Sequence, residues 1–226
     1  MIKTYSSSSL DRTPLTRKSI AQFLVVSMHV AGIIGLAIPY TQPIFLILTP
    51  FNLLCTLFLL IDWHIKWTKK FAAYIAIAWI VSFTVEALGV NTGQIFGAYT
   101  YGPVLGPQLF DTPLMIGVNW LILLISTGHI AALWHQNPNI RALIAASLMV
   151  AMDLIIEPVA IYFNFWNWQQ VDVPLQNYLG WFITALILQL LYSHLKINPK
   201  NRLAILVILS QTVFFIALNL IIFKQA

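Results

Sequence analysis

Charged residues are scarce in this chain of 226 residues. Asp, Glu, Lys and Arg together make up 8% of it, whereas 59% of the residues are hydrophobic. A soluble domain carries about 25% charged residues, so a chain with this composition could not cover a surface that faces water. The scarcity of charge excludes a soluble globular protein and predicts an integral membrane protein.

Cysteine and several signature motifs are also missing. Cys55 is the single cysteine, which excludes a disulfide within the chain. There is no HExxH, no cysteine pair and no histidine cluster, and neither a GxGxxG nor a Walker sequence. We therefore expect no metal site and no nucleotide cofactor. A retinal photoreceptor needs a lysine inside its last span to form a Schiff base. The last apolar segment here has no such lysine, since Lys224 lies at its very end, and this argues against a retinal photoreceptor.

Long apolar runs are what the chain has instead. Each is about 20 residues long, enough to cross a hydrocarbon core of roughly 30 Å as a helix. The sequence predicts an all-α, polytopic integral membrane bundle of about seven transmembrane helices, forming a single domain over residues 19–226, after a flexible cytoplasmic tail at residues 1–18. The predicted spans are 19–38, 43–63, 71–90, 112–134, 140–162, 176–196 and 202–223.

The basic residues indicate the orientation. If the spans alternate in direction, eleven of the twelve fall on one side, and only Lys224 falls on the other. The positive-inside rule then places the N-terminus in the cytoplasm and the C-terminus outside. We read the net charge of +5 as this topology signal and expect no nucleic-acid partner. The eleven are Lys3, Arg12, Arg17, Lys18, Lys66, Lys69, Lys70, Arg141, Lys196, Lys200 and Arg202.

Acidic residues are fewer still, and their positions are uneven. Four of the seven, Glu86, Asp111, Asp153 and Glu157, fall in the outer half of the predicted spans or at their outer edge. The two long loops, 91–111 and 163–175, lie on the same side. An ionisable group inside a membrane costs free energy, so it indicates function by default. We therefore look for the site at the outer end of the bundle.

Asp153 and Glu157 are four residues apart and share one face of a helix. Two carboxyl groups close together in a low dielectric should not both be charged, so we expect one to hold a proton. Plainer interpretations remain open for the other acids. Glu86 could reach the interface as a single residue near a helix end, and Asp111 could only cap the span that follows it.

Polar and aromatic neighbours accompany these acids. Asn119 and Asn177 could orient carboxyl groups or could only link helices by hydrogen bonds. Trp166 and Trp168 follow the fifth span, and we interpret them as aromatic residues of the membrane interface. His29 in the first span is interpreted as a packed histidine.

Four stretches carry a family resemblance. They are EALGVNTGQIFGAYTYGPVLGPQL, PLMIGVNW, DLIIEPVA with FWNW, and VPLQNYLGW, in that order over about residues 80–185. Together they resemble the membrane carotenoid-biosynthesis family that includes bisanhydrobacterioruberin hydratase and bacterial carotenoid 1,2-hydratases. The resemblance implies addition of water to the terminal C=C of an acyclic carotenoid end group, giving a tertiary alcohol without a cofactor. It also implies a lipophilic carotenoid substrate, contact with membrane lipid, association with other enzymes of the pathway, and a place in a bacterial cytoplasmic membrane.

Such a reaction needs a proton donor, a means of holding a tertiary carbocation, and water. We predict that Asp153 and Glu157 form the pair of acid and stabilising carboxylate, without assigning which residue has which role. Glu86 is expected to be a further acid or the base that positions water. The residues expected to hold water or to line the end-group pocket are Tyr99, Tyr101, Asn119, Trp120, Asn177 and Trp181.

Two other classes of function stay open from the sequence: an end-group cyclase or another membrane enzyme that modifies isoprenoids, and a membrane protein without enzymatic activity. An end-group cyclase would form the same cation and quench it by ring closure, which a dry site would favour. A proton-coupled transporter or a carotenoid-binding protein would also use intramembrane acids. A transporter should carry polar residues in both halves of the membrane, whereas the cytoplasmic halves of these spans are nearly bare.

Overall fold

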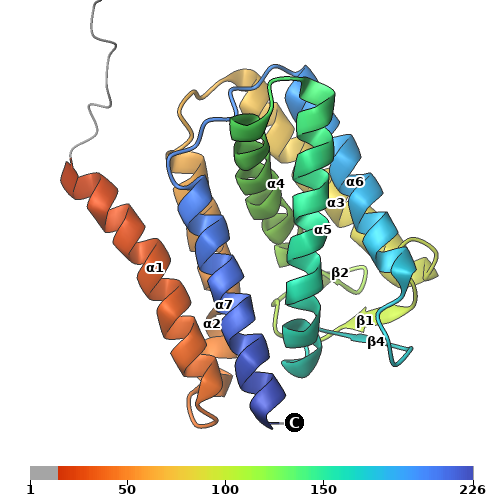
Figure 1. The fold of residues 1–226 in the computed structure, drawn as a ribbon. Coiled ribbons are helices and arrows are strands. Elements are labelled where there is room, and N and C mark those ends of the chain that lie inside the picture. The colour runs from red at the N-terminus through yellow and green to blue at the C-terminus, as the bar shows by residue number, and fades with distance from the viewer. Residues whose placement is uncertain (1–14, 226) are drawn as a thin grey trace, which may run out of the picture.

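The computed structural model describes residues 15–225, which form seven helices and four short strands (Figure 1). The helices are α1 (Leu15–Ala37), α2 (Gln42–Asp62), α3 (Lys69–Thr92), α4 (Leu114–Trp134), α5 (Pro138–Tyr162), α6 (Leu175–His194) and α7 (Ala204–Gln225). The all-α polytopic bundle expected from the sequence is confirmed. The largest boundary difference is at α1, which begins at Leu15 and so includes the last residues assigned to the tail; residues 1–14 lie outside the described residues.

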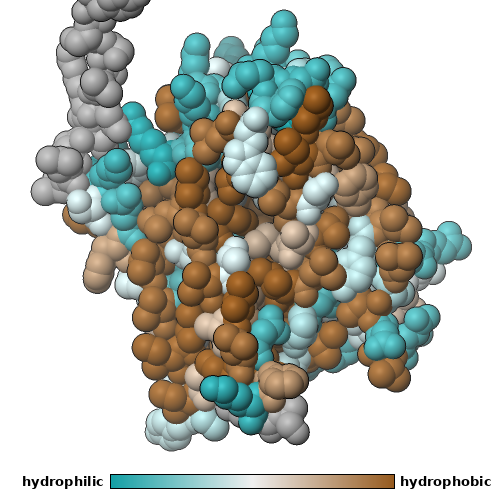
Figure 2. Space-filling model, viewed as in Figure 1, coloured by the Kyte–Doolittle hydropathy of each residue, from teal (hydrophilic) through white to brown (hydrophobic). Residues whose placement is uncertain are grey.

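The outer surface of the bundle suits lipid. Six of the described helices are long and apolar enough to cross a membrane; α6, with two glutamines, an asparagine and a histidine, is outside that group. Large apolar side chains stand on the surface, such as Phe23 and Ile47, each 70% exposed. In Figure 2 hydrophobic residues cover the middle of the visible face, and hydrophilic residues gather toward the end that carries the basic loops. A surface of this kind is stable only against hydrocarbon.

Helix α4 is the central helix of the bundle. It packs against α2, α3, α5, α6 and α7, and its residues from Leu121 to Ile125 are almost completely buried. Its sequence is apolar on every side, as expected for a helix with neighbours all around it. The buried acids Glu86, Asp153 and Glu157 lie on two of the neighbouring helices, α3 and α5.

The predicted basic side of the bundle is one physical end. The connections α2–α3, α4–α5 and α6–α7 lie there together with the start of α1 (Figure 1). Arg17 Nη2 lies 2.6 Å from Asp62 Oδ2 and its guanidinium lies over Trp63, so α1 is tied to the end of α2. The clustering agrees with the positive-inside prediction, and cytoplasmic placement of this end remains a prediction.

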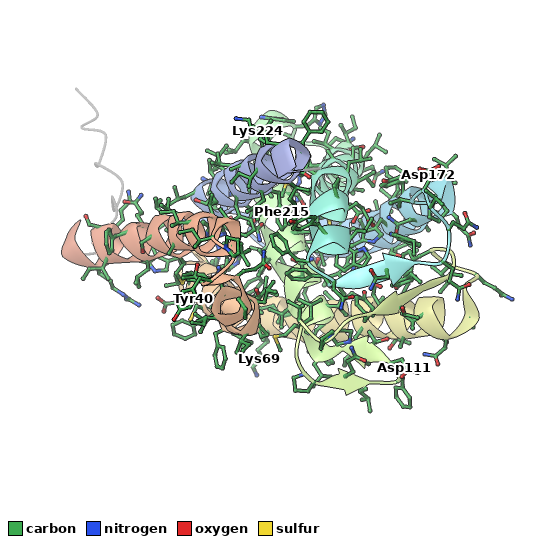
Figure 3. All side chains as sticks on the ribbon, turned by 90° about the horizontal axis from the view of Figure 1, so that it is seen from below. Tyr40, Lys69, Asp111, Asp172, Phe215 and Lys224 are labelled. Atoms are coloured by element: carbon green, nitrogen blue, oxygen red, sulfur yellow. The ribbon has the colours of Figure 1, made fainter. Side chains whose placement is uncertain are left out.

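The opposite end, which we call the outer end, carries the strands (Figure 3). Strand β1 (Tyr99–Tyr101) pairs antiparallel with β4 (Trp166–Trp168), so the α3–α4 and α5–α6 connections are joined. We call this pair the outer ribbon. Strands β2 (Gln108–Leu109) and β3 (Thr112–Pro113) form a hairpin whose turn, Phe110 and Asp111, has positive φ at both residues. Asp111 is exposed in that turn, and the cap of α4 is Pro113.

Phe96, in the connection after α3, packs this connection against the bundle. Phe96, 1% exposed, lies between Gly89 of α3 and Gly180 of α6. A Cβ at Gly89 would come within 2.5 Å of the Phe96 ring, and one at Gly180 would come within 2.8 Å of the Ile95 carbonyl oxygen. Both positions therefore need glycine, because the two helices must let this ring and its backbone approach.

Candidate active site

The three carboxyl groups expected from the sequence meet inside the outer part of the bundle. Glu86 comes from α3, and Asp153 and Glu157 come from successive turns of α5. All three are buried, with 2%, 0% and 3% of their surfaces exposed. We call them the carboxyl cluster. Buried carboxyl groups are stable only with hydrogen-bond partners, and those partners define the site.

Glu86 accepts three hydrogen bonds. Tyr99 and Tyr101 donate their hydroxyls to Oε2 at 2.6 and 2.8 Å, and Trp120 donates its indole N–H to Oε1 at 2.9 Å. The tyrosines come from the outer ribbon and the tryptophan from the central helix. Glu86 is therefore embedded in the protein. The interpretation of Glu86 as a single residue that reaches the membrane interface is wrong.

Glu157 also accepts three hydrogen bonds. The indole groups of Trp166 and Trp168 donate to Oε2 at 2.9 and 3.0 Å, and Asn177 Nδ2 donates to Oε1 at 3.2 Å. The interpretation of the two tryptophans as interface residues is corrected, because their N–H groups point inward to this carboxyl. Aromatic residues that follow a span are typical of the membrane interface, so the sequence pattern did not indicate that these two tryptophans bind a carboxyl group.

Asp153 lies one helical turn before Glu157 on α5, does not line this side of the site as Glu157 does, and is linked to Glu157 by Asn177. The amide nitrogen of Asn177 donates to Asp153 Oδ2 at 2.8 Å as well as to Glu157. The other oxygen, Oδ1, is buried and has no hydrogen-bond partner among the described residues. Asn177, half of the predicted amide pair, thus orients two carboxyl groups from α6.

Strand geometry explains how four aromatic residues reach two glutamates. Side chains two residues apart in a strand share one face, so Tyr99 and Tyr101 point the same way, as do Trp166 and Trp168. The register pairs Tyr99 with Trp168 and Tyr101 with Trp166. The four rings therefore form one aromatic layer, with ring centroids 4.9 Å apart for Tyr99 and Trp168.

A small cavity lies inside this arrangement. It measures about 10 Å³, which approaches the space of a single water molecule. Glu86 and Glu157 both line it, together with the ring of Trp181, which stacks on Trp120 at 4.3 Å. We call it the carboxyl pocket. Its remaining lining residues are Tyr99, Tyr101, Ile116, Trp166, Trp168 and Asn177.

Asn119 is the one predicted site residue that lies elsewhere. It lines a larger cavity of about 340 Å³, whereas its neighbour Trp120 donates its N–H to Glu86. Trp120 does not line that cavity, so these two neighbours in the sequence contact different parts of the outer end. The large cavity shares Ile116 and Trp166 with the carboxyl pocket.

The partners of the carboxyl cluster are N–H and O–H donors. Among residues 15–225, no group of three or more His, Cys, Asp or Glu side chains has an arrangement that could hold a metal ion. The cluster can hold and exchange protons beside aromatic faces, in the interior of the bundle and away from bulk water. Fold and site together define a polytopic membrane protein with a buried acid site.

Comparison with known proteins makes this class more specific. A family profile described as "Carotenoid biosynthesis protein" matches residues 41–225, and the chain belongs to that family. Over 127 residues it is 32% identical to the bisanhydrobacterioruberin hydratase of Haloarcula japonica, a match that covers 50% of this chain and 42% of that protein. The chain thus matches less than half the length of that curated relative. No solved structure matches it.

Proposed function

We propose that this protein is a carotenoid hydratase, which adds water to the terminal C=C of an acyclic end group to give a tertiary alcohol. The observation that carries the proposal is the carboxyl pocket, where two buried glutamates with different partners face one water-sized space. Membership of the carotenoid biosynthesis family and the hydratase relative support the substrate class.

The partners suggest different roles for the two glutamates. An indole N–H can only donate, so the two indoles on Glu157 Oε2 favour a carboxylate there. A tyrosine hydroxyl can donate or accept, so Tyr99 and Tyr101 can satisfy Glu86 in both protonation states. We assign Glu86 as the acid and Glu157 as the carboxylate. This differs from the pairing of Asp153 with Glu157 expected from the sequence.

The proposed reaction proceeds in two steps. The proton of Glu86 adds to the less substituted carbon of the terminal double bond, whose π electrons form the new C–H bond and leave a tertiary cation. Water then attacks that cation and gives a proton to Glu157, and transfer of one proton from Glu157 to Glu86 restores the site. The Glu157 carboxylate and the rings of Trp166 and Trp181 would stabilise the cation.

Asp153 does not line the carboxyl pocket and would act through Glu157. Its single hydrogen bond and its unpartnered Oδ1 suit a neutral carboxyl group, because an unpaired charge with this burial would be costly. We propose that neutral Asp153 fixes Asn177 and limits the negative charge in the cluster.

Expression in a bacterial host that accumulates an acyclic carotenoid tests this function. Mass spectrometry of the pigments should show the mass of one water gained per modified end. Glu86→Gln and Glu157→Gln should each lower product by about 100-fold or more, the usual contribution of an acid–base group. Asp172→Asn, in an exposed outer loop, is the matched control and should keep full turnover.

Three results would contradict the proposal. Wild-type turnover in both glutamine variants would remove the assigned site. A product with the mass of the substrate would indicate a cyclase, in which ring closure and proton loss quench the cation. Unchanged pigments with correctly inserted protein would favour a carotenoid-binding protein or transporter.

A further inference from the structure

The carboxyl pocket is too small for a carotenoid end group. At about 10 Å³ it holds water, so the terminal carbons must reach it from an adjoining space. The adjoining space is the cavity of about 340 Å³ between α1, α2, α4, α5 and α7, which we call the lateral cavity. This volume lies within the usual range for small-molecule sites.

Among residues 15–225, two side chains line both spaces. Ile116 and Trp166 line the lateral cavity on one side and the carboxyl pocket on the other. Trp166 also donates its N–H to Glu157, so its ring is held in place between an apolar space and a carboxyl group. An end group in the lateral cavity would therefore be separated from the acids by single side chains.

The lateral cavity faces the lipid side of the bundle. Leu48, Phe51 and Cys55 of α2 line it and are exposed on the surface that faces the membrane. In Figure 3 Phe215, another lining residue, lies on the inner side of α7. A hydrophobic solute dissolved in the bilayer can thus reach the cavity sideways, without crossing water.

The few polar groups in this cavity point to an oxygen-bearing occupant or an accompanying water. Gln211 is 5% exposed, lines the cavity, and has an Oε1 atom without a hydrogen-bond partner among the described residues. Thr56 donates to Asn52 Oδ1 at 3.1 Å, and Asn119 lies one turn after Ile116. Polar groups of this number fix orientation in otherwise apolar sites.

We propose that the lateral cavity binds the acyclic end of a linear polyene, which enters from the bilayer on the α2 side and places its terminal double bond at Ile116 and Trp166. The Gln211 oxygen accepts a hydrogen bond from an O–H group in the cavity, from water before the reaction or the tertiary alcohol after it. The catalytic outcome rests on the proposed function, whereas occupancy of the cavity can be measured without any reaction.

Cys55, the single cysteine of the chain, supplies the probe. Purified protein in lipid nanodiscs is treated with a membrane-permeant maleimide, and the labelling rate is followed by mass spectrometry. Lycopene in the nanodisc lipid should slow labelling of Cys55 by about fivefold or more, whereas β-carotene, whose ends are both cyclised, should slow it less.

A second cysteine provides the matched control. Leu143 is 48% exposed on α5, does not line the cavity, and lies a similar number of residues from the basic end. Its labelling in Cys55→Ala/Leu143→Cys protein should not respond to lycopene. In addition, prior labelling of Cys55 with a bulky maleimide should block conversion of the polyene, and the same treatment should not change the turnover of Cys55→Ala protein from that variant's own untreated value.

The outcomes separate the two proposals. Equal labelling rates of Cys55 with and without lycopene, in protein that hydrates lycopene, would overturn the assignment of the lateral cavity. Protection of Cys55 without any hydrated product would support the cavity and contradict the hydratase. Protection should persist in Glu86→Gln protein, because this substitution removes the proton donor and leaves the lateral cavity unchanged.

Discussion

At the scale of single residues, Glu86 and Glu157 differ in the kind of donor that each meets. Both accept three hydrogen bonds, but Glu157 faces two indoles, and Glu86 faces two phenols and one indole. The difference matters because a phenol can reverse its hydrogen bond when the carboxyl group gains a proton, and an indole cannot. In the proposed mechanism, the phenols let Glu86 give up and regain its proton, and the indoles favour the charged form of Glu157 before water attacks.

Removal of one tyrosine hydroxyl should show that Glu86 depends on these hydrogen bonds. We expect Tyr99→Phe or Tyr101→Phe to lower turnover by about tenfold and to destabilise the protein by about 1–3 kcal/mol, because Glu86 loses one partner in a buried site. Tyr40→Phe, at a position 89% exposed, is the control. Product formation in cells and thermal unfolding in detergent measure the two effects.

The combined variant sharpens the test. The two tyrosines share one carboxyl oxygen, so their effects should not add independently. A Tyr99→Phe/Tyr101→Phe protein with wild-type turnover would show that Glu86 does not depend on hydroxyl partners. The role assigned to Glu86 as the acid would then lose its basis.

At the scale of elements, the outer ribbon determines the site. Strands β1 and β4 come from connections separated in sequence by two helices, and their pairing brings phenols to Glu86 and indoles to Glu157. The ribbon lies at the outer end, where backbone without helical hydrogen bonds is tolerated because protein covers it. Its position depends on Phe96, which fills the space between the glycines of α3 and α6.

A substitution at Gly89 should disturb this packing. Gly89→Ala places a methyl group 2.5 Å from the Phe96 ring, and we expect overpacking to cost about 1–3 kcal/mol and to lower turnover. Phe96→Leu should relieve the clash, so the double variant should be more stable than the sum of the single effects. A thermal unfolding cycle of the four proteins measures this coupling; strictly additive effects would contradict the contact.

At the scale of the whole molecule, the site lies at the end opposite the basic loops. We therefore expect it to lie near the outer face of the membrane. In a Cys55→Ala background, Asp172→Cys should react with a membrane-impermeant maleimide added to intact cells, and Lys196→Cys should react only after lysis. The reverse pattern would invert the topology and place the carboxyl cluster on the cytoplasmic side.

The sequence by itself determined the bundle and the acids within it. Twenty-residue apolar runs cross a membrane as helices whatever their neighbours are, because backbone groups in hydrocarbon must be satisfied within each helix. The spacing of Asp153 and Glu157 fixed a shared face for the same local reason. The pairing of β1 with β4 joins two connections that are distant in the sequence, so local sequence patterns could not predict it.

Tertiary structure alone decided which partners each acid has. YTY and WNW have the same two-residue spacing, a weak signal of paired strands, but their register depends on how α3 to α6 pack. That packing turned Trp166 and Trp168 toward Glu157, placed Asn119 in the lateral cavity, and put Asp153 behind the pocket. Hydrogen-bond partners and cavities arise between elements, where contacts distant in sequence determine the geometry.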